Sequence, residues 1–313
     1  MSAPSPLFDV HCHLVDARLA HCDVVSLLDE ARAAGVRNLV VNGTCEGDWA
    51  RVAALADTHR GCVIASFGLH PWCVAAATPR WAEELQEVLE RHPRAAIGEA
   101  GLHHGAGCDA TPAQQAAALA TQLRMATQLR RPISLHCVRA PGAMHEQLLA
   151  ASPASGYQDT GLLLHGYSGS AEMVPRFAAL GAHFSFSASL AGMAPTRAAA
   201  LVRAVPDDRL LLETDAPDGL PRGGSGVGMQ LRHAPAPPQR LAFGAPPCGC
   251  DASDNDEAAL KREAPPLNHP ANLRAVLQLV ARLRGIEEEA LAALAWQNSR
   301  RLVAACLDHD GSD

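Results

Sequence analysis

Short apolar runs alternate with longer amphipathic stretches along most of the chain. The runs have the length of buried strands, and the stretches between them carry apolar residues at helical spacing. The pattern predicts eight strands, at Leu7–His11, Asn38–Val41, Val63–Gly68, Ala95–Glu99, Ile133–His136, Leu162–His165, His183–Phe186 and Leu210–Glu213. The clearest predicted helices are Val24–Ala34, Thr111–Arg131, Pro270–Arg284 and Glu287–Leu307. Eight strand–helix alternations predict a parallel sheet closed into a (β/α)8 TIM-type barrel, an α/β fold, with residues 1–313 as a single domain.

One segment, at about residues 218–268, interrupts this alternation. It is rich in Gly, Pro and charged residues and has no sustained periodicity. We therefore expect a long, partly mobile insertion loop after the eighth strand. Such a loop would emerge at the end of the barrel where enzymes of this fold carry their sites. Two interpretations stay open, an insertion without a role and a lid over the site.

Composition narrows the possible functions. Apolar residues make up 48% of the chain, which is enough for a large core, and the formal net charge is −7. That charge argues against binding nucleic acid by bulk electrostatics, because phosphates attract basic surfaces. It leaves room for local contacts through metal ions.

Neither the cysteines nor the N-terminus indicates an exported or membrane protein. The ten cysteines include no C-x-x-C pair, which argues against structural zinc and thioredoxin-like chemistry. The first residues show no signal-peptide pattern, and no apolar run reaches membrane-spanning length. We expect an intracellular protein without a stable protein partner, first of all in the cytoplasm, with the nucleus or an organelle left open.

Polar residues gather at the C-terminal ends of the predicted strands. His11 and His13 are two positions apart, so an extended backbone points them to the same face. The other strand ends carry His70, Glu99, His136, His165 and Asp215. In a barrel these positions converge on one mouth. Each residue alone could be a hydrogen-bonded core histidine, an ion-pair partner or a helix cap, but seven coincident placements favour a site.

A two-metal centre accounts for this set. Four imidazoles and two carboxylates in one pocket are costly to bury unless cations engage them. The predicted ligands are His11, His13, Glu99, His136, His165 and Asp215, with three or four donors for each ion if Glu99 bridges the two. A pair of divalent ions activates water and stabilises charge on a phosphoryl or acyl oxygen, so the sequence predicts a metal-dependent hydrolase.

The order of the motifs resembles that of TatD-type metal-dependent deoxyribonucleases, a branch of the amidohydrolase superfamily. The shared motifs are D-x-H-C-H at Asp9–His13, G-L-H-P at Gly68–Pro71, I-G-E-x-G-L at Ile97–Leu102, the strand ending in His136, L-H-x-x-S-G-S at Leu164–Ser170 and E-T-D-x-P at Glu213–Pro217. The stretches "FGLHPW", "HCVRA" and "LNHPANL" are most similar to plant-type members. The resemblance covers nearly the whole chain outside the loop.

This resemblance implies a hydrolase of phosphodiester bonds, a 3′-5′ exonuclease on DNA ends or single-stranded DNA, with two divalent cations of Mg, Mn or Zn. It implies that His11, His13, Glu99 and Asp215 hold one ion, and that the second ion is held by Glu99, His136 and His165. Asp215 would also orient or deprotonate the attacking water. His70, outside the ligand set, would contact the scissile phosphate or the leaving group.

Two positions depart from the family pattern. His103 stands where most members have an aspartate after the glutamate motif. The loss of that charge could lower activity or change metal preference, or His103 could supply a donor of its own. Arg139 follows His136 by three residues where the family usually has an arginine two residues on, so its phosphate contact transfers only weakly.

The same residues are compatible with other functions. Related barrels bridge their metals with a carboxylated lysine, but the only lysine here, Lys261, lies in the loop, which excludes that route. Release of D-amino acids from tRNA, or another ester hydrolysis, on the same ions is an alternative. A metal-binding scaffold that has lost catalysis is a further one. The sequence leaves open the metal, the preference for DNA or RNA, and the oligomeric state.

Overall fold

A computed structural model describes residues 5–152, 157, 160–221, 232–234 and 266–307. Eight strands form one sheet in chain order, and every bonded pair is parallel. The strands are β1 (Leu7–Cys12), β2 (Val36–Asn42), β3 (Val63–Phe67), β4 (Ala96–His103), β5 (Ile133–Val138), β6 (Leu162–Leu164), β7 (Ala182–Phe186) and β8 (Leu210–Leu212). The predicted (β/α)8 barrel is confirmed.

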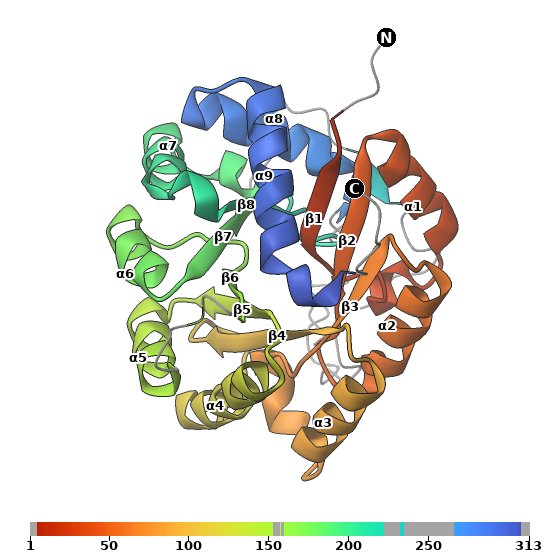
Figure 1. The fold of residues 1–313 in the computed structure, drawn as a ribbon. Helices are drawn as coiled ribbons and strands as arrows, with labels where there is room; N and C mark the ends of the chain where they lie inside the picture. The colour runs from red at the N-terminus through yellow and green to blue at the C-terminus, as the bar shows by residue number, and fades with distance from the viewer. Residues whose placement is uncertain (1–4, 153–156, 158–159, 222–231, 235–265, 308–313) are drawn as a thin grey trace, which may run out of the picture.

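Helices surround the strands, as Figure 1 shows. They are α1 (Val24–Ala33), α2 (Glu46–Thr58), α3 (Trp81–Arg91), α4 (Pro112–Leu129), α5 (Pro141–Ala151), α6 (Val174–Ala179), α7 (Pro195–Ala204), α8 (Leu273–Arg284) and α9 (Glu288–Leu302). Local sequence explains their ends. Thr111 and Gln114 form a capping box at the start of α4, and α8 stops at Gly285, whose φ is 77°. No helix of the described residues is long and apolar enough to cross a membrane.

The barrel closes between its first and last strands. Backbone hydrogen bonds join Asp215 N to His11 O at 2.9 Å and His13 N to Ala216 O at 2.7 Å. Beside them, the buried carboxylate of Asp9 accepts the backbone N–H of Thr214 at 2.9 Å and its hydroxyl at 2.5 Å. The motif residues of β1 and β8 therefore make the seam of the barrel.

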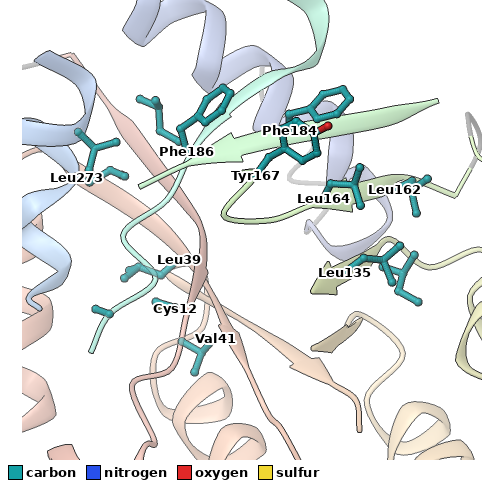
Figure 2. Close-up of a cluster of buried hydrophobic side chains, with 14 of the residues drawn as sticks. Cys12, Leu39, Val41, Leu135, Leu162, Leu164, Tyr167, Phe184, Phe186 and Leu273 are labelled. Carbon is teal, nitrogen blue, oxygen red and sulfur yellow. The ribbon is translucent and has the colours of Figure 1, made fainter. Parts of the chain in front are cut away.

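Apolar side chains fill both faces of the strands, as expected for a parallel sheet. One cluster lies between the strands and the helices, and Figure 2 shows part of it, with Leu39, Leu162 and Phe184. A second cluster fills the barrel interior toward the N-terminal ends of the strands, where Phe8 packs 5.9 Å from the Trp296 ring of α9. The polar residues of the predicted site lie at the opposite end of the barrel, beyond this apolar cluster.

The strand boundaries agree with the prediction within two residues, except at the end of β4. This strand continues past Glu99 to His103, and Gly101, Leu102 and His103 pair with β5 after a register shift. Gly101 permits this close pairing, because its φ is 147° and an added Cβ would collide with the carbonyl oxygen of His136. The sequence suggested a loop here, and the longer strand places His103 beside His136.

Most of the predicted insertion loop lies outside the described residues. Its described parts include β9 (His233–Ala234), which pairs antiparallel with β10 (Leu267–Asn268). Whether this segment is a lid, and whether the whole chain is one domain, remain predictions.

Candidate metal centre

Glu99 lies at the centre of the predicted site and is almost fully buried, with 2% of its surface exposed. Its Oε1 atom lies 2.7 Å from His136 Nδ1, 2.7 Å from His165 Nε2 and 3.3 Å from His70 Nε2. Its Oε2 atom lies 3.0 Å from His13 Nε2 and 3.3 Å from His11 Nε2. Five histidines from the ends of four strands therefore surround one carboxylate.

The C-terminal ends of six strands position these side chains. His11, Glu99 and His136 belong to β1, β4 and β5, and the other four residues, His13, His70, His165 and Asp215, follow β1, β3, β6 and β8. The 2-residue spacing of His11 and His13 works as predicted, since their Nε2 atoms lie 3.1 Å apart.

Asp215 completes the site at its outer edge. Its Oδ1 atom lies 3.8 Å from His13 Nε2 and 3.9 Å from His11 Nε2, and its side chain is 23% exposed. The residue has a φ of 54°, a left-handed conformation that aspartate tolerates better than most residues. All seven residues predicted from the strand ends thus meet at one mouth.

Three groups of side chains could each hold a metal ion, because their ligand atoms lie within 4.8 Å of one another. They are His11–His13–Glu99, His11–His165–Asp215 and His70–Glu99–His136. Two of these groups share Glu99. The grouping is compatible with a carboxylate between two ions.

The hydrogen bonds of His13 test whether the donor set fits a cation. Its Nδ1 lies 3.0 Å from the carbonyl oxygen of Asn42, which can only accept, so Nδ1 carries the proton. In a neutral ring Nε2 then presents a lone pair to the carboxylates of Glu99 and Asp215. Lone pairs facing carboxylates require a cation or a further proton between them. Imidazole and carboxylate donors together suit zinc or manganese, so the residues fit a divalent metal.

The pKa values of His13, Glu99 and Asp215 show how burial and neighbouring charges act on the site. Burial lowers the pKa of His13, but the hydrogen bond and charge of Glu99 outweigh it and raise this pKa to about 9. Burial likewise opposes ionisation of Glu99, yet the surrounding histidines hold its pKa well below the usual range. Burial, reinforced by the Glu213 carboxylate, raises the pKa of Asp215 well above the usual range. The ionised carboxylate of Glu99 therefore attracts positive charge, which protonated histidines or a bound cation would supply.

His70 differs from His13 in its tautomer. Its Nδ1 accepts the backbone N–H of Trp72 at 3.1 Å, so a neutral ring carries its proton on Nε2. That N–H points to Glu99 Oε1 and is a donor, not a metal ligand. The expectation that His70 lies outside the ligand set therefore has a physical basis, although His70 lies close enough to be grouped with Glu99 and His136.

Two buried side chains behind the site had no role assigned from sequence. Ser134 Oγ lies 2.8 Å from His11 Nδ1, and Glu213 Oε1 lies 3.7 Å from His165 Nδ1, with its other oxygen bound to Ser185 at 2.5 Å. At this distance Glu213 faces His165 without a hydrogen bond, and both atoms are buried without a partner among the described residues. A spacing signal existed for Ser134, because it stands two residues before His136 and shares its face of β5.

The two departures from the family pattern lie in different environments. His103 is buried, and its Nδ1 atom lies 2.9 Å from His136 Nε2. Arg139 follows β5, is exposed, and has a φ of 55°. Its contact with a phosphate remains a prediction.

Comparison with known proteins agrees with this geometry. The family model described as TatD related DNase matches residues 8–304. A protein of Cronobacter sakazakii named 3′-5′ ssDNA/RNA exonuclease TatD is 31% identical over 217 residues, which cover 69% of this chain and 80% of that protein. An Escherichia coli protein named uncharacterized metal-dependent hydrolase YjjV is 33% identical over a stretch that covers 67% of this chain and 79% of the length of that protein.

Solved structures show the same fold. The crystal structure of Escherichia coli YjjV, a TatD homologue, has a TM-score of 0.74 and 26% identity, covering 95% of this chain and 97% of that one. A TatD-family hydrolase from Entamoeba histolytica has a TM-score of 0.75 at 15% identity, covering 96% and 99%, and supports the fold alone. The narrower likeness to plant-type members remains a prediction. The barrel fold and the clustered candidate metal ligands agree with the family match over residues 8–304, and the chain belongs to the TatD related DNase family.

Proposed function

We propose that this protein is a divalent-metal-dependent phosphodiesterase that removes nucleotides from the 3′ ends of single-stranded DNA. The observation that carries the proposal is the environment of Glu99, whose two oxygens face five imidazole nitrogens within 3.3 Å. The name of the Cronobacter sakazakii relative, 3′-5′ ssDNA/RNA exonuclease, supports the substrate class. RNA remains open as a further substrate.

The proposed ligands form two overlapping sets. His11, His13, Glu99 and Asp215 would hold one ion, and Glu99, His136 and His165 the other. The ions would be Mg, Mn or Zn, since both imidazole and carboxylate donors are present. Bound there, two divalent cations lower the pKa of water and neutralise charge developing on phosphoryl oxygens.

Asp215 and His70 are the proposed proton-handling residues. The side chain of Asp215 is 23% exposed at the mouth of the site, so a water molecule can reach its carboxylate. It would orient the attacking water and accept its proton. His70 would donate its Nε2–H to a phosphate oxygen or to the leaving group, because the backbone of Trp72 keeps that nitrogen protonated.

Digestion of a 5′-labelled single-stranded oligonucleotide tests this function. Metal-depleted protein should be inactive, and returning Mg²⁺, Mn²⁺ or Zn²⁺ should produce a ladder of products shortened from the 3′ end. Glu99→Gln should lower the rate by at least about a hundredfold, because it removes the bridging charge. The exposed Glu90→Gln on α3 is the matched control and should digest normally.

The alternatives give different results. Release of D-amino acids from aminoacyl-tRNA without a DNA ladder would replace the nuclease by the ester hydrolase. Bound metal without either product would indicate the scaffold. Unchanged digestion by Glu99→Gln would overturn the mechanism.

A further inference from the structure

The side chain of His103 is packed between other rings beside the candidate metal centre. Its ring stacks on that of His136, with centroids 5.2 Å apart and planes inclined by 20°. On another side the ring of Trp72 makes an edge contact, with centroids again 5.2 Å apart. His103 is 9% exposed, so its ring is packed rather than solvated.

The backbone of His103 is also held on both sides. Gln115, buried on α4, accepts the N–H of His103 at 2.7 Å and donates to its carbonyl oxygen at 3.1 Å. Gly105 leaves room for the ring, because an added Cβ there would lie 2.6 Å from His103 Nε2. These contacts fix where the nitrogens of His103 point.

A chain of hydrogen bonds connects this ring to the metal centre. The ring nitrogen Nε2 of His103 faces the turn at residues 105–106, since an added Cβ on Gly105 would lie 2.6 Å from it, and the ring bonds the backbone of Ala106. Since Nδ1 faces His136, the nitrogen that donates to Ala106 is Nε2. In a neutral ring, His103 Nδ1 is then an acceptor for the Nε2–H of His136, 2.9 Å away. His136 is left with a lone pair on Nδ1, the atom 2.7 Å from Glu99 Oε1.

We propose that His103 is a positioning residue that accepts the Nε2–H of His136 and so presents Nδ1 of His136 to the metal. This inference rests on the metal centre proposed above. A metal-binding histidine usually donates its second N–H to a carboxylate, a backbone carbonyl or water. In this protein the neutral imidazole of His103 is the acceptor of that second N–H. The substitution of the family aspartate therefore keeps an acceptor while removing a negative charge.

The alternative tautomer would be unproductive. If His136 carried its proton on Nδ1, that proton would point to Glu99 and block the nitrogen that faces the ion. His103 excludes this arrangement as long as its Nε2–H remains bound to Ala106. The proposal therefore concerns which nitrogen of His136 is free, and NMR can read that directly.

The first test is ¹⁵N NMR of histidine rings in the Zn²⁺-loaded full chain. His136 should show metal on Nδ1 and a proton on Nε2, with the Nε2 proton hydrogen-bonded to His103. Metal on Nε2 of His136 would overturn the proposal. This measurement needs no variant of His103 and is independent of folding defects.

The second test measures metal affinity by titrating metal-depleted protein with Co²⁺, followed by absorption. His103→Leu should weaken one of two bound ions by about 10- to 100-fold, the usual effect of losing such a partner. His103→Asn should restore most of the affinity, because its amide oxygen lies near the place of Nδ1. The exposed neighbour, tested as His104→Leu, should bind like the parent protein.

The outcomes separate this inference from the proposed function. If the parent protein binds no metal, the proposed function fails. If the parent protein binds two ions and degrades DNA, but His103→Leu binds as tightly as His104→Leu, only the role of His103 fails. Equal loss in His103→Leu and His103→Asn would indicate packing rather than a hydrogen-bond acceptor, and would also overturn the proposal.

Discussion

At the scale of single residues, the buried histidines differ in the groups that they contact and in the effect of burial on their protonation. Those around Glu99 face carboxylates, whereas His183 on β7 is 8% exposed and its Nδ1 has no hydrogen-bond partner. Burial, together with the nearby charge of Arg209, lowers the pKa of His183 from 6.5 to about 4. His183 is therefore buried in its neutral form and should make folding sensitive to acid.

The variant His183→Gln tests this sensitivity. In the unfolded chain this histidine becomes protonated below about pH 6.5, whereas in the folded protein it becomes protonated only near pH 4. The contribution of neutral His183 to the free energy of unfolding is therefore fully present above pH 6.5 and decreases as the pH falls from 6.5 to 4. His183→Gln should lower the slope of unfolding free energy against pH in this window by up to about 1.4 kcal/mol per unit.

Urea unfolding at several pH values would measure the effect. His104→Gln, at an exposed position, serves as the control and should leave the slope unchanged. Identical slopes for His183→Gln and the parent protein would show that His183 does not titrate across this range.

The sequence predicted the residues of the site better than their protonation. The 2-residue spacing of His11 and His13 and the strand-end positions of Glu99 and His136 were sufficient to find the cluster. The tautomers could not be predicted from the sequence, because the Asn42 carbonyl that determines the tautomer of His13 is 29 residues away in the chain. Which nitrogen carries a proton depends on such tertiary contacts.

At the scale of elements, α4 positions two of the strand ends that carry the site. Gln115 and Gln122 lie two turns apart on its buried face. Gln115 bonds the backbone of His103, and Gln122 accepts the N–H of Leu69 at 2.8 Å and donates to its carbonyl oxygen at 3.1 Å. One helix thus holds the segments that precede His70 and end β4.

Gln122→Leu should destabilise the protein by roughly 2–4 kcal/mol, because it leaves the N–H and C=O of Leu69 buried without partners. It should also lower the rate of DNA digestion, since His70 is the next residue. Denaturant unfolding and the oligonucleotide assay measure the two effects. Gln128→Leu, exposed on the same helix, should change stability by less than about 0.5 kcal/mol. Similar losses in the two variants would contradict this role of Gln122.

The prediction of elements was most accurate where periodicity was strong. Helix α1 ends within one residue of the expected position, and α4 within two at either end. The end of β4 was missed because Gly101, just past the predicted strand, is typical of loops, whereas here its φ of 147° serves a strand that pairs closely with β5. Such close pairing depends on the neighbouring strand and leaves no local pattern.

At the scale of the whole molecule, charge limits how DNA is held. With a net charge of −7, the protein should gain little affinity from releasing counterions along a strand. We expect a plot of log affinity against log salt to have a slope no steeper than about −2 for a single-stranded oligonucleotide. Binding should also favour strand ends over long duplexes.

Fluorescence anisotropy with a phosphorothioate oligonucleotide, which resists cleavage, would measure this slope. A slope of about −5 or steeper, or a footprint of many base pairs, would show an extended basic surface and contradict the expectation. A closed circular single strand is a useful comparison, because it offers the same phosphates without an end.

The seam between β1 and β8 links completion of the fold to completion of the site. His11 and Asp215 are joined through their backbones, and Asp9 bonds Thr214, although these residues are about 200 positions apart in the chain. A nascent chain on the ribosome would possess most of the ligands long before Asp215 is synthesised. It would nevertheless lack the seam that joins the first and last strands, so the site cannot form before the chain has been synthesised past Ala216, and a product truncated before that residue would lack both the seam and Asp215.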